Sequence, residues 1–221
     1  MITLKKSVVV FDVDGTLISS TKLVEDSMME TLKNYDSKIK TREDIKKFYG
    51  PDEVGMFRGL LKNPTLADNA FKEYLQHYEE NDLTYIPKLI PGIGELLREL
   101  DTRRTLRLGC VTGRTKESLD ITGKRLNFLR FFEDIEVGSP KGVNKAETIK
   151  VLMRKFGVDR AEVIYVGDLA SDIKAMKAAG VNIISVYYDH PENKDELMEL
   201  NPNRTVGSVE DLRNLLFKLI R

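Results

Sequence analysis

The feature that most constrains this chain is an apolar run followed directly by two acids, between Val8 and Leu17. The run begins Val-Val-Val-Phe, and its β-branched residues favour a strand buried on both faces, as in the middle of a parallel sheet. Asp12 and Asp14 follow this strand, and Gly15 allows a sharp turn with its backbone close to a ligand. Ligands of open α/β sheets bind outside the carboxyl ends of the strands, so both acids would line such a site. Taken alone, the stretch is equally compatible with a surface turn or a hairpin.

Residues 18–87 contain no strand-like run and show apolar residues at helical spacing. Thr21 is expected to cap a first helix, and Thr41 with Asp44 a second one that ends near residues 49–51. A third helix is expected over residues 52–61, and a fourth carries one apolar face formed by Phe71, Tyr74, Leu75 and Tyr78. The pattern predicts a small α-helical domain at residues 18–87, with hinges at residues 17–20 and 84–91.

From Pro91 onward, strand and helix patterns alternate, which predicts a doubly wound, mostly parallel, Rossmann-like α/β fold. Residues 1–17 and 88–221 would form this domain, with right-handed crossovers keeping the strands parallel. Asn144 with Glu147 is expected to cap one of the helices. Further strands are expected at 106–111, 135–137, 163–166 and 183–186. Helices are expected at 93–100, 115–127 and between Asn144 and Gly157, then one with Asp172 in its first turn that ends at Gly180, and one after Ser208.

Polar residues follow three of the expected strands, so they should share one rim of the sheet: Asp12, Asp14, Thr112, Asp168 and Asp172. Carboxylates converging there would repel one another unless a cation lay among them, and oxygen ligands favour a hard ion such as Mg²⁺. The hydroxyl of Thr112 and the amide of Gly113, just before a helix, would suit a phosphoryl group. Lys145 and Lys141 are the candidates for a lysine that completes the charge balance.

The hexapeptide Asp-Val-Asp-Gly-Thr-Leu at residues 12–17 resembles the signature of the haloacid dehalogenase superfamily, most of whose members are phosphohydrolases. Further stretches at Thr112, Lys145 and Asp168 follow in the expected order, so the resemblance covers nearly the whole chain. It implies a Mg²⁺-dependent hydrolase of small phosphomonoesters, with phosphoglycolate-like substrates as one expectation. Members that act on carbon–halogen or phosphonate bonds lack an acid at the position of Asp14, so its presence favours phosphate esters.

The resemblance also implies individual roles. Asp12 would be the nucleophile that becomes an aspartyl phosphate, and Asp14 the acid that protonates the leaving oxygen and later activates water. Thr112, Gly113 and a lysine, with Lys145 preferred to Lys141, would hold the phosphoryl oxygens. Mg²⁺ would be bound by Asp12, the main-chain carbonyl of Asp14 and Asp168, with Asp172 as a direct or water-mediated ligand.

Two departures from the family pattern leave assignments open. The second motif reads Thr-Gly-Arg where many relatives carry Asn after the Thr or Ser, which leaves the role of Arg114 undefined. The lysine region lacks the familiar Lys-Pro pair, which leaves the choice between Lys145 and Lys141 unsettled. The helical segment resembles an α-helical cap that closes over the site, and its turn at Gly50 is the candidate to face the substrate, with an ordinary interhelical turn as the alternative.

Other functions remain compatible with the same motifs. A phosphomutase of the β-phosphoglucomutase type would share every core motif, and a non-catalytic Mg²⁺-binding regulator would share the fold. A response-regulator receiver also places acids, a hydroxyl and a lysine around Mg²⁺, but it is shorter and has no helical insertion after its first acids. The motifs therefore favour a hydrolase without separating it from a mutase.

The amino-acid composition limits the kinds of molecule that the chain is expected to bind. Lys plus Arg equal Asp plus Glu, at 35 each, so no net charge favours nucleic acid or an anionic membrane. The absence of a leader-like or membrane-length apolar run predicts a cytoplasmic protein. We expect a monomer or homodimer. The family resemblance implies a small phosphorylated metabolite as the substrate. The single Cys110 is expected to be buried, and His77 and His190 to be surface residues rather than ligands.

Overall fold

The computed structural model describes residues 7–86, 88–142 and 144–220, and within these ranges six strands form one sheet in the order β3-β2-β1-β4-β5-β6. Every neighbouring pair is parallel, and the first strand lies between β2 and β4. The carboxyl ends of β2, β1 and β4 therefore meet at one rim. The strands are β1 (Val8–Phe11), β2 (Arg107–Val111), β3 (Asp134–Glu136), β4 (Val163–Gly167), β5 (Asn182–Val186) and β6 (Thr205–Val206).

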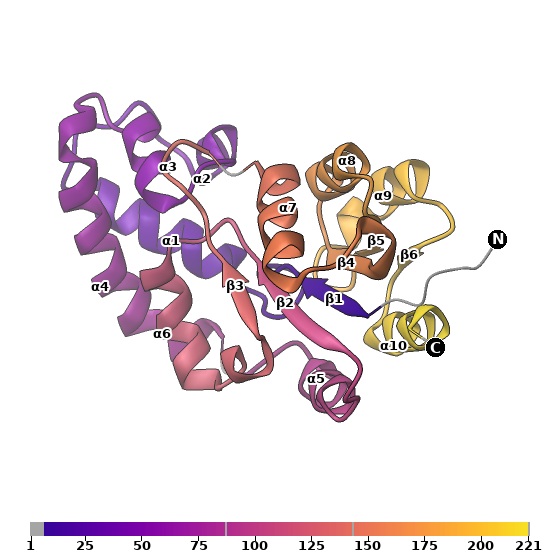
Figure 1. Ribbon diagram of the computed structural model, residues 1–221. Helices are drawn as coiled ribbons and strands as arrows, with labels where there is room; N and C mark the ends of the chain where they lie inside the picture. The colour runs from indigo at the N-terminus through magenta and orange to yellow at the C-terminus, as the bar shows by residue number, and fades with distance from the viewer. Residues whose placement is uncertain (1–6, 87, 143, 221) are drawn as a thin grey trace.

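Helices cover both faces of the sheet, as Figure 1 shows, and this confirms the predicted doubly wound α/β fold. Alternate residues of β1 point to opposite faces: Val8 and Val10 pack with α7 and α8, and Val9 and Phe11 pack with α5 and α10. A strand buried on both sides must be apolar at every position, which explains the unbroken Val-Val-Val-Phe run. The helices of this part are α5 (Ile93–Asp101), α6 (Lys116–Leu126), α7 (Lys145–Phe156), α8 (Ala170–Ala179), α9 (Lys194–Leu200) and α10 (Val209–Leu219).

Four helices stand between β1 and α5 and pack together beside the sheet, at the left in Figure 1. We call them the helical insertion. Tyr74 is fully buried at their centre, with its ring against those of Phe57, Phe71 and Tyr78. The aromatic face predicted from the sequence is therefore core. The helices are α1 (Thr21–Leu32), α2 (Arg42–Ile45), α3 (Glu53–Leu60) and α4 (Ala67–Tyr85), and short 3₁₀ turns occupy Lys46–Phe48, Pro64–Leu66, Leu129–Phe131, Arg160–Glu162 and Pro191–Asn193.

The two connections to the insertion lie side by side, because the amide of Ile90 donates to the carbonyl of Leu17 at 3.0 Å. This places both predicted hinge segments at one end of the insertion, although Pro87 of the second hinge lies outside the described residues. The division at residues 18–87 itself stays a prediction. No helix in the described ranges has the length and apolarity needed to cross a membrane.

The expected cap at Thr21 is wrong. Helix α1 begins at Thr21, its N-cap position is Ser20, and neither side chain closes a capping hydrogen bond. The Ser20 hydroxyl donates instead to the carboxylate of Asp14, so a longer-range contact replaces the local cap. The pair Thr41 and Asp44 does form the expected capping box at α2.

Candidate active site

Asp12 stands at the carboxyl end of β1 with only 3% of its surface exposed. Its Oδ1 accepts a hydrogen bond from the amide of Val13 at 2.8 Å, and its Oδ2 accepts one from Lys145 Nζ at 2.7 Å. Burial raises the pKa of Asp12 to about 7; the positive charge of Lys145 limits that rise, and the negative charge of Asp172 adds to it. The fold thus fixes the orientation of the Asp12 carboxylate at the rim and raises its pKa.

Two further buried carboxylates, those of Asp168 and Asp172, converge on Asp12. Oxygens of Asp12, Asp168 and Asp172 lie within 4.8 Å of one another. Burial, followed by repulsion from Asp12 and Asp172, raises the pKa of Asp168 well above its ordinary value. In the part of the chain that the structure describes, the buried Asp168 Oδ1 accepts no hydrogen bond. A buried unpartnered oxygen is costly, and an all-oxygen donor set with an unfilled acceptor fits a hard divalent cation.

Two glycines make the acids' close approach possible. Gly15 has a φ of +68°, and a Cβ there would lie 2.1 Å from Asp168 Oδ2. A Cβ at Gly167 would lie 2.6 Å from Asp172 Oδ2. Both positions need glycine because a side chain would occupy the volume of a carboxylate.

Lys145 reaches the acids from the first turn of α7, which Asn144 caps by accepting from the amide of Glu147. Its Nζ lies 2.7 Å from Asp12 Oδ2 and 2.6 Å from Asp172 Oδ1. Lys141 is exposed, and its backbone amide donates to Ser139 Oγ. Of the two candidate lysines, the structure brings Lys145 to the acids.

Thr112 is fully buried at the end of β2, and its Oγ1 accepts from the amide of Arg114 at 3.3 Å. Gly113 follows it with open space where a Cβ would stand, so the backbone there is accessible to a ligand. The loop that follows β3 packs tightly against Gly113, because a Cβ at Gly138 would lie 2.1 Å from the carbonyl oxygen of Gly113.

The predicted turn of the helical insertion contacts the loop that follows β3. The amide of Asp52, which also caps α3, donates to the carbonyl of Ser139 at 3.1 Å. Gly50 itself is exposed with a φ of +137°, and a Cβ there would meet nothing within 4 Å. The turn therefore lies next to the loop after β3, while Gly50 has no packed neighbour among the described residues.

The Asp14 carboxylate is not part of the three-acid cluster. Arg114 Nε donates to both of its oxygens, at 2.9 and 3.0 Å, and Nη2 lies 2.8 Å from Oδ1. Burial alone would raise the pKa of Asp14, but the charge and hydrogen bonds of Arg114 and the hydroxyl of Ser20 hold it below the ordinary value. Only the main-chain carbonyl of Asp14 remains as the ligand that the sequence predicts.

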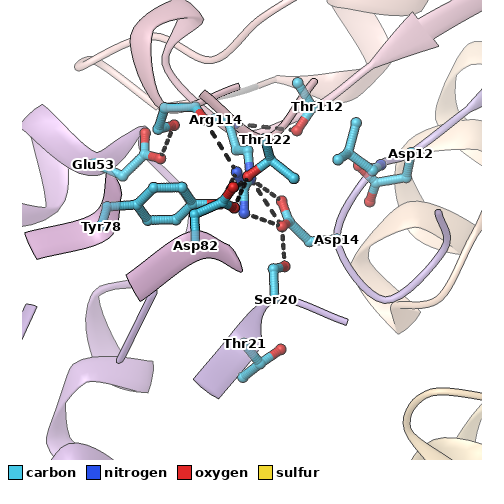
Figure 2. A network of polar contacts seen from close by, with 12 residues as sticks. Asp12, Asp14, Ser20, Thr21, Glu53, Tyr78, Asp82, Thr112, Arg114 and Thr122 are labelled. Carbon is cyan, nitrogen blue, oxygen red and sulfur yellow. Dashed lines mark hydrogen bonds and ion pairs between the residues drawn. The ribbon is translucent and has the colours of Figure 1, made fainter. Parts of the chain in front are cut away.

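The contacts of Arg114 were not predicted from the sequence (Figure 2). The guanidinium donates through Nη1 to the hydroxyl of Tyr78 at 2.6 Å, and it lies 5.1 Å from the centre of that ring. The only available signal was a charged residue directly after Thr112-Gly113. Its partners are 36 and 100 residues away, so no local pattern identifies them.

His190 is also closer to this rim than expected. Its side chain is 20% exposed and its Nε2 lies 3.2 Å from Thr21 Oγ1. A Cβ at Gly15 would lie 3.1 Å from the ring. His190 is therefore half-buried rather than fully exposed, because the loop after β5 packs against residues 15 and 21.

Comparison with protein families decides the relationship. The family model described as haloacid dehalogenase-like hydrolase matches residues 9–186. The chain belongs to this family. That membership confirms the resemblance drawn from residues 12–17, and it identifies the protein as a hydrolase of the family.

Several named relatives match nearly the whole of this chain. The pyrophosphatase PpaX of Bacillus pumilus is 28% identical over 213 residues, covering 92% of this chain and 93% of the relative. A haloacid dehalogenase-like hydrolase from Streptococcus pneumoniae superposes with a TM-score of 0.73 at 23% identity, covering 95% and 98%. A predicted phosphoglycolate phosphatase from Haemophilus somnus reaches 0.78 at 18% identity, covering 96% and 98%. The two structures share the fold.

Proposed function

We propose that this protein is a Mg²⁺-dependent phosphatase of small phosphomonoesters that acts through an aspartyl phosphate on Asp12. The observation that carries the proposal is the placement of Asp12 at the rim, with Lys145 bonded to it, the cluster of acids beside it and Asp14 two residues on. Phosphoryl transfer depends mainly on positioning and on neutralised oxygens, which this arrangement supplies. The names of the relatives, phosphatases and a pyrophosphatase, support the same reaction class.

The reaction proceeds in two displacements. A carboxylate oxygen of Asp12 attacks phosphorus, the bond from phosphorus to the ester oxygen breaks, and Asp14 gives that oxygen a proton. Because Arg114 holds the pKa of Asp14 low, Asp14 must take up this proton before it can donate it. Asp14 then takes a proton from water, whose oxygen attacks the phosphorus and releases Asp12 and inorganic phosphate. Splitting the displacement in this way is the general advantage of a covalent intermediate.

The remaining residues hold the transferred group. Thr112, Gly113 and Lys145 would bind the phosphoryl oxygens, with Lys145 neutralising charge shared with Asp12. Mg²⁺ would be held by Asp12, Asp168, Asp172 and the carbonyl of Asp14, and when bound it would neutralise the carboxylates and the phosphoryl oxygens.

The helical insertion would act as the cap that excludes water and selects the substrate. Its turn at residues 49–52 lies beside the loop after β3, at the rim. A cap over the site favours small molecules, and the relatives point to two classes: phosphoglycolate-like esters and inorganic pyrophosphate.

A phosphate-release screen tests the proposal. The purified chain is incubated with small phosphomonoesters, phosphoglycolate and inorganic pyrophosphate, with Mg²⁺ and with a chelator, and phosphate is measured. We expect Mg²⁺-dependent release from at least one small ester. Release from none of them contradicts the proposal, and transfer of phosphate between positions of a sugar phosphate without net release would identify a mutase.

A further inference from the structure

Arg114 is the one arginine at the rim, in the part of the chain that the structure describes, that is both nearly fully buried and paired with a motif acid. A buried guanidinium is stable only where its charge and its donors are matched. Here Nε and Nη2 face the carboxylate of Asp14. Nε donates to both oxygens of Asp14 and Nη2 lies 2.8 Å from Oδ1, so the planar group holds the carboxylate in one orientation, which a lysine ammonium does not do.

The other edge of the same guanidinium faces the helical insertion. Nη1 donates to the hydroxyl of Tyr78, on α4, and that hydroxyl also lies 2.8 Å from Thr122 Oγ1 on α6. Ser20, in the connection to the insertion, also donates to Asp14 Oδ1 (Figure 2). The carboxylate of Asp14 is thus held by Arg114 from the sheet domain and by Ser20 from the hinge. Arg114 is in turn held by Tyr78 of the insertion.

A second contact docks the insertion at the same place. The carboxylate of Glu53, in the first turn of α3, accepts from the amide of Thr115 at 2.7 Å and from the hydroxyl of Ser118. These donors belong to the N-terminal end of α6, which follows Arg114 directly. The insertion therefore contacts the side chain of Arg114 through Tyr78 and the backbone that follows it through Glu53.

We propose that Arg114 is a positioning residue that makes the placement of Asp14 depend on docking of the helical insertion. This inference rests on the proposed function, since it concerns the acid that serves the leaving group. When the insertion is docked, Tyr78 orients the guanidinium and the guanidinium orients Asp14. When it is not, the arginine loses that partner and Asp14 loses a fixed position.

The inference has a kinetic signature that a purely structural arginine lacks. A positioned proton donor contributes most when the leaving group is a poor one, as in an alkyl phosphate, and little for p-nitrophenyl phosphate. We expect Arg114→Ala to lower kcat at least ~100-fold for the best alkyl ester of the screen and less than ~10-fold for p-nitrophenyl phosphate, with a small change in KM. Arg114→Lys should show the same ordering because it lacks the planar group, and added guanidinium ion should restore part of the Arg114→Ala loss.

Arg107 provides the matched control. Its guanidinium is also paired with a carboxylate, that of Glu133, and donates to the carbonyl of Phe156, and these partners belong neither to the insertion nor to the Asp14 motif. Arg107→Ala should change both esters by the same factor. Tyr78→Phe, which removes a single hydroxyl, should lower kcat about 10-fold for the alkyl ester and leave p-nitrophenyl phosphate nearly unchanged.

The outcomes separate the two proposals. If the unmodified protein releases phosphate but Arg114→Ala and Arg114→Lys affect both esters equally, Arg114 does not position Asp14 and the inference is wrong. If Arg114→Ala does not fold, Arg114→Lys and Tyr78→Phe carry the same comparison. Phosphate release from no ester by the unmodified protein overturns the proposed function and the inference with it.

Discussion

At the scale of single residues, the chemistry depends on side chains that are far apart in sequence. Lys145 and Asp12 are 133 residues apart, yet their charged atoms are in contact. A cation at the first position of a helix is opposed by the helix dipole at about 0.3–1 kcal/mol. The contacts with Asp12 and Asp172 outweigh that cost, and they raise the pKa of Lys145 well above its ordinary value although burial lowers it.

Paired kinetics on the two lysines test this assignment. Lys145→Ala should lower kcat/KM at least ~100-fold, or about 2.7 kcal/mol of transition-state stabilisation, because the phosphoryl oxygens lose their buried cation. Lys141→Ala is the control and should cost less than ~10-fold, since its side chain is exposed. The reverse order of effects would move the phosphate-binding role to Lys141.

The sequence predicted the rim acids and the preferred lysine, because each is adjacent to a strand end or a helix start. The partners of Arg114 were not predicted from the sequence. Tyr78 falls on an aromatic face that any packed helix would show, and its hydroxyl acquires a role only through packing of α4 against α6. Ser20 was predicted only as the end of the hinge at residues 17–20, and its bond to Asp14 depends on the folded structure.

At the scale of elements, long and strongly periodic segments were predictable and short ones were not. The strand β6 has two residues, too few to show alternation, and α9 lies in a mostly polar stretch with Leu197 as its one buried residue. Both were missed for that reason. The aromatic face of α4, by contrast, repeats over two turns and was recognised as core.

The turn at Gly50 gives a prediction at this scale. A bulky residue such as Phe at Gly50 should change KM and kcat unequally among substrates, because the turn lies beside the rim while the reacting groups are on the sheet. Gly157→Phe is the matched control: Gly157 also has positive φ and open space at its Cβ position, but it ends α7 at the far end from Lys145. Kinetics of both variants over the active esters are compared. Equal, negligible effects on every substrate would remove the turn from the site.

At the scale of the whole molecule, the parallel sheet places β1 between β2 and β4, and this order gathers acids from separate parts of the chain. Alternating patterns predicted a parallel sheet, but strand order depends on packing of the complete chain. The gathered acids also affect stability. Asp168 has a pKa well above its ordinary value, so its ionisation costs folding free energy at any pH above that ordinary value.

Thermal unfolding tests this cost. Without Mg²⁺, Asp168→Asn should raise Tm relative to the unmodified protein, and the difference should grow as pH rises above the ordinary carboxyl range. Mg²⁺ should raise Tm of the unmodified protein, with about 2.7 kcal/mol of stabilisation at a hundredfold excess over Kd, and should act more weakly on Asp168→Asn. An Asp168→Asn variant that is less stable without Mg²⁺, or that responds to it equally, would contradict the cation site.

The central claim is that phosphate passes through the carboxylate of Asp12, and borohydride trapping tests it most directly. The protein is quenched during turnover of its best ester and treated with borohydride, which reduces an aspartyl phosphate to homoserine, and the peptide containing residue 12 is analysed by mass spectrometry. Asp12→Asn is the control; it keeps the shape of the side chain, should fold normally and should release no phosphate. We expect homoserine at position 12 in the unmodified protein and only in the presence of substrate. Sustained phosphate release without modification of Asp12, or release by Asp12→Asn, would contradict it.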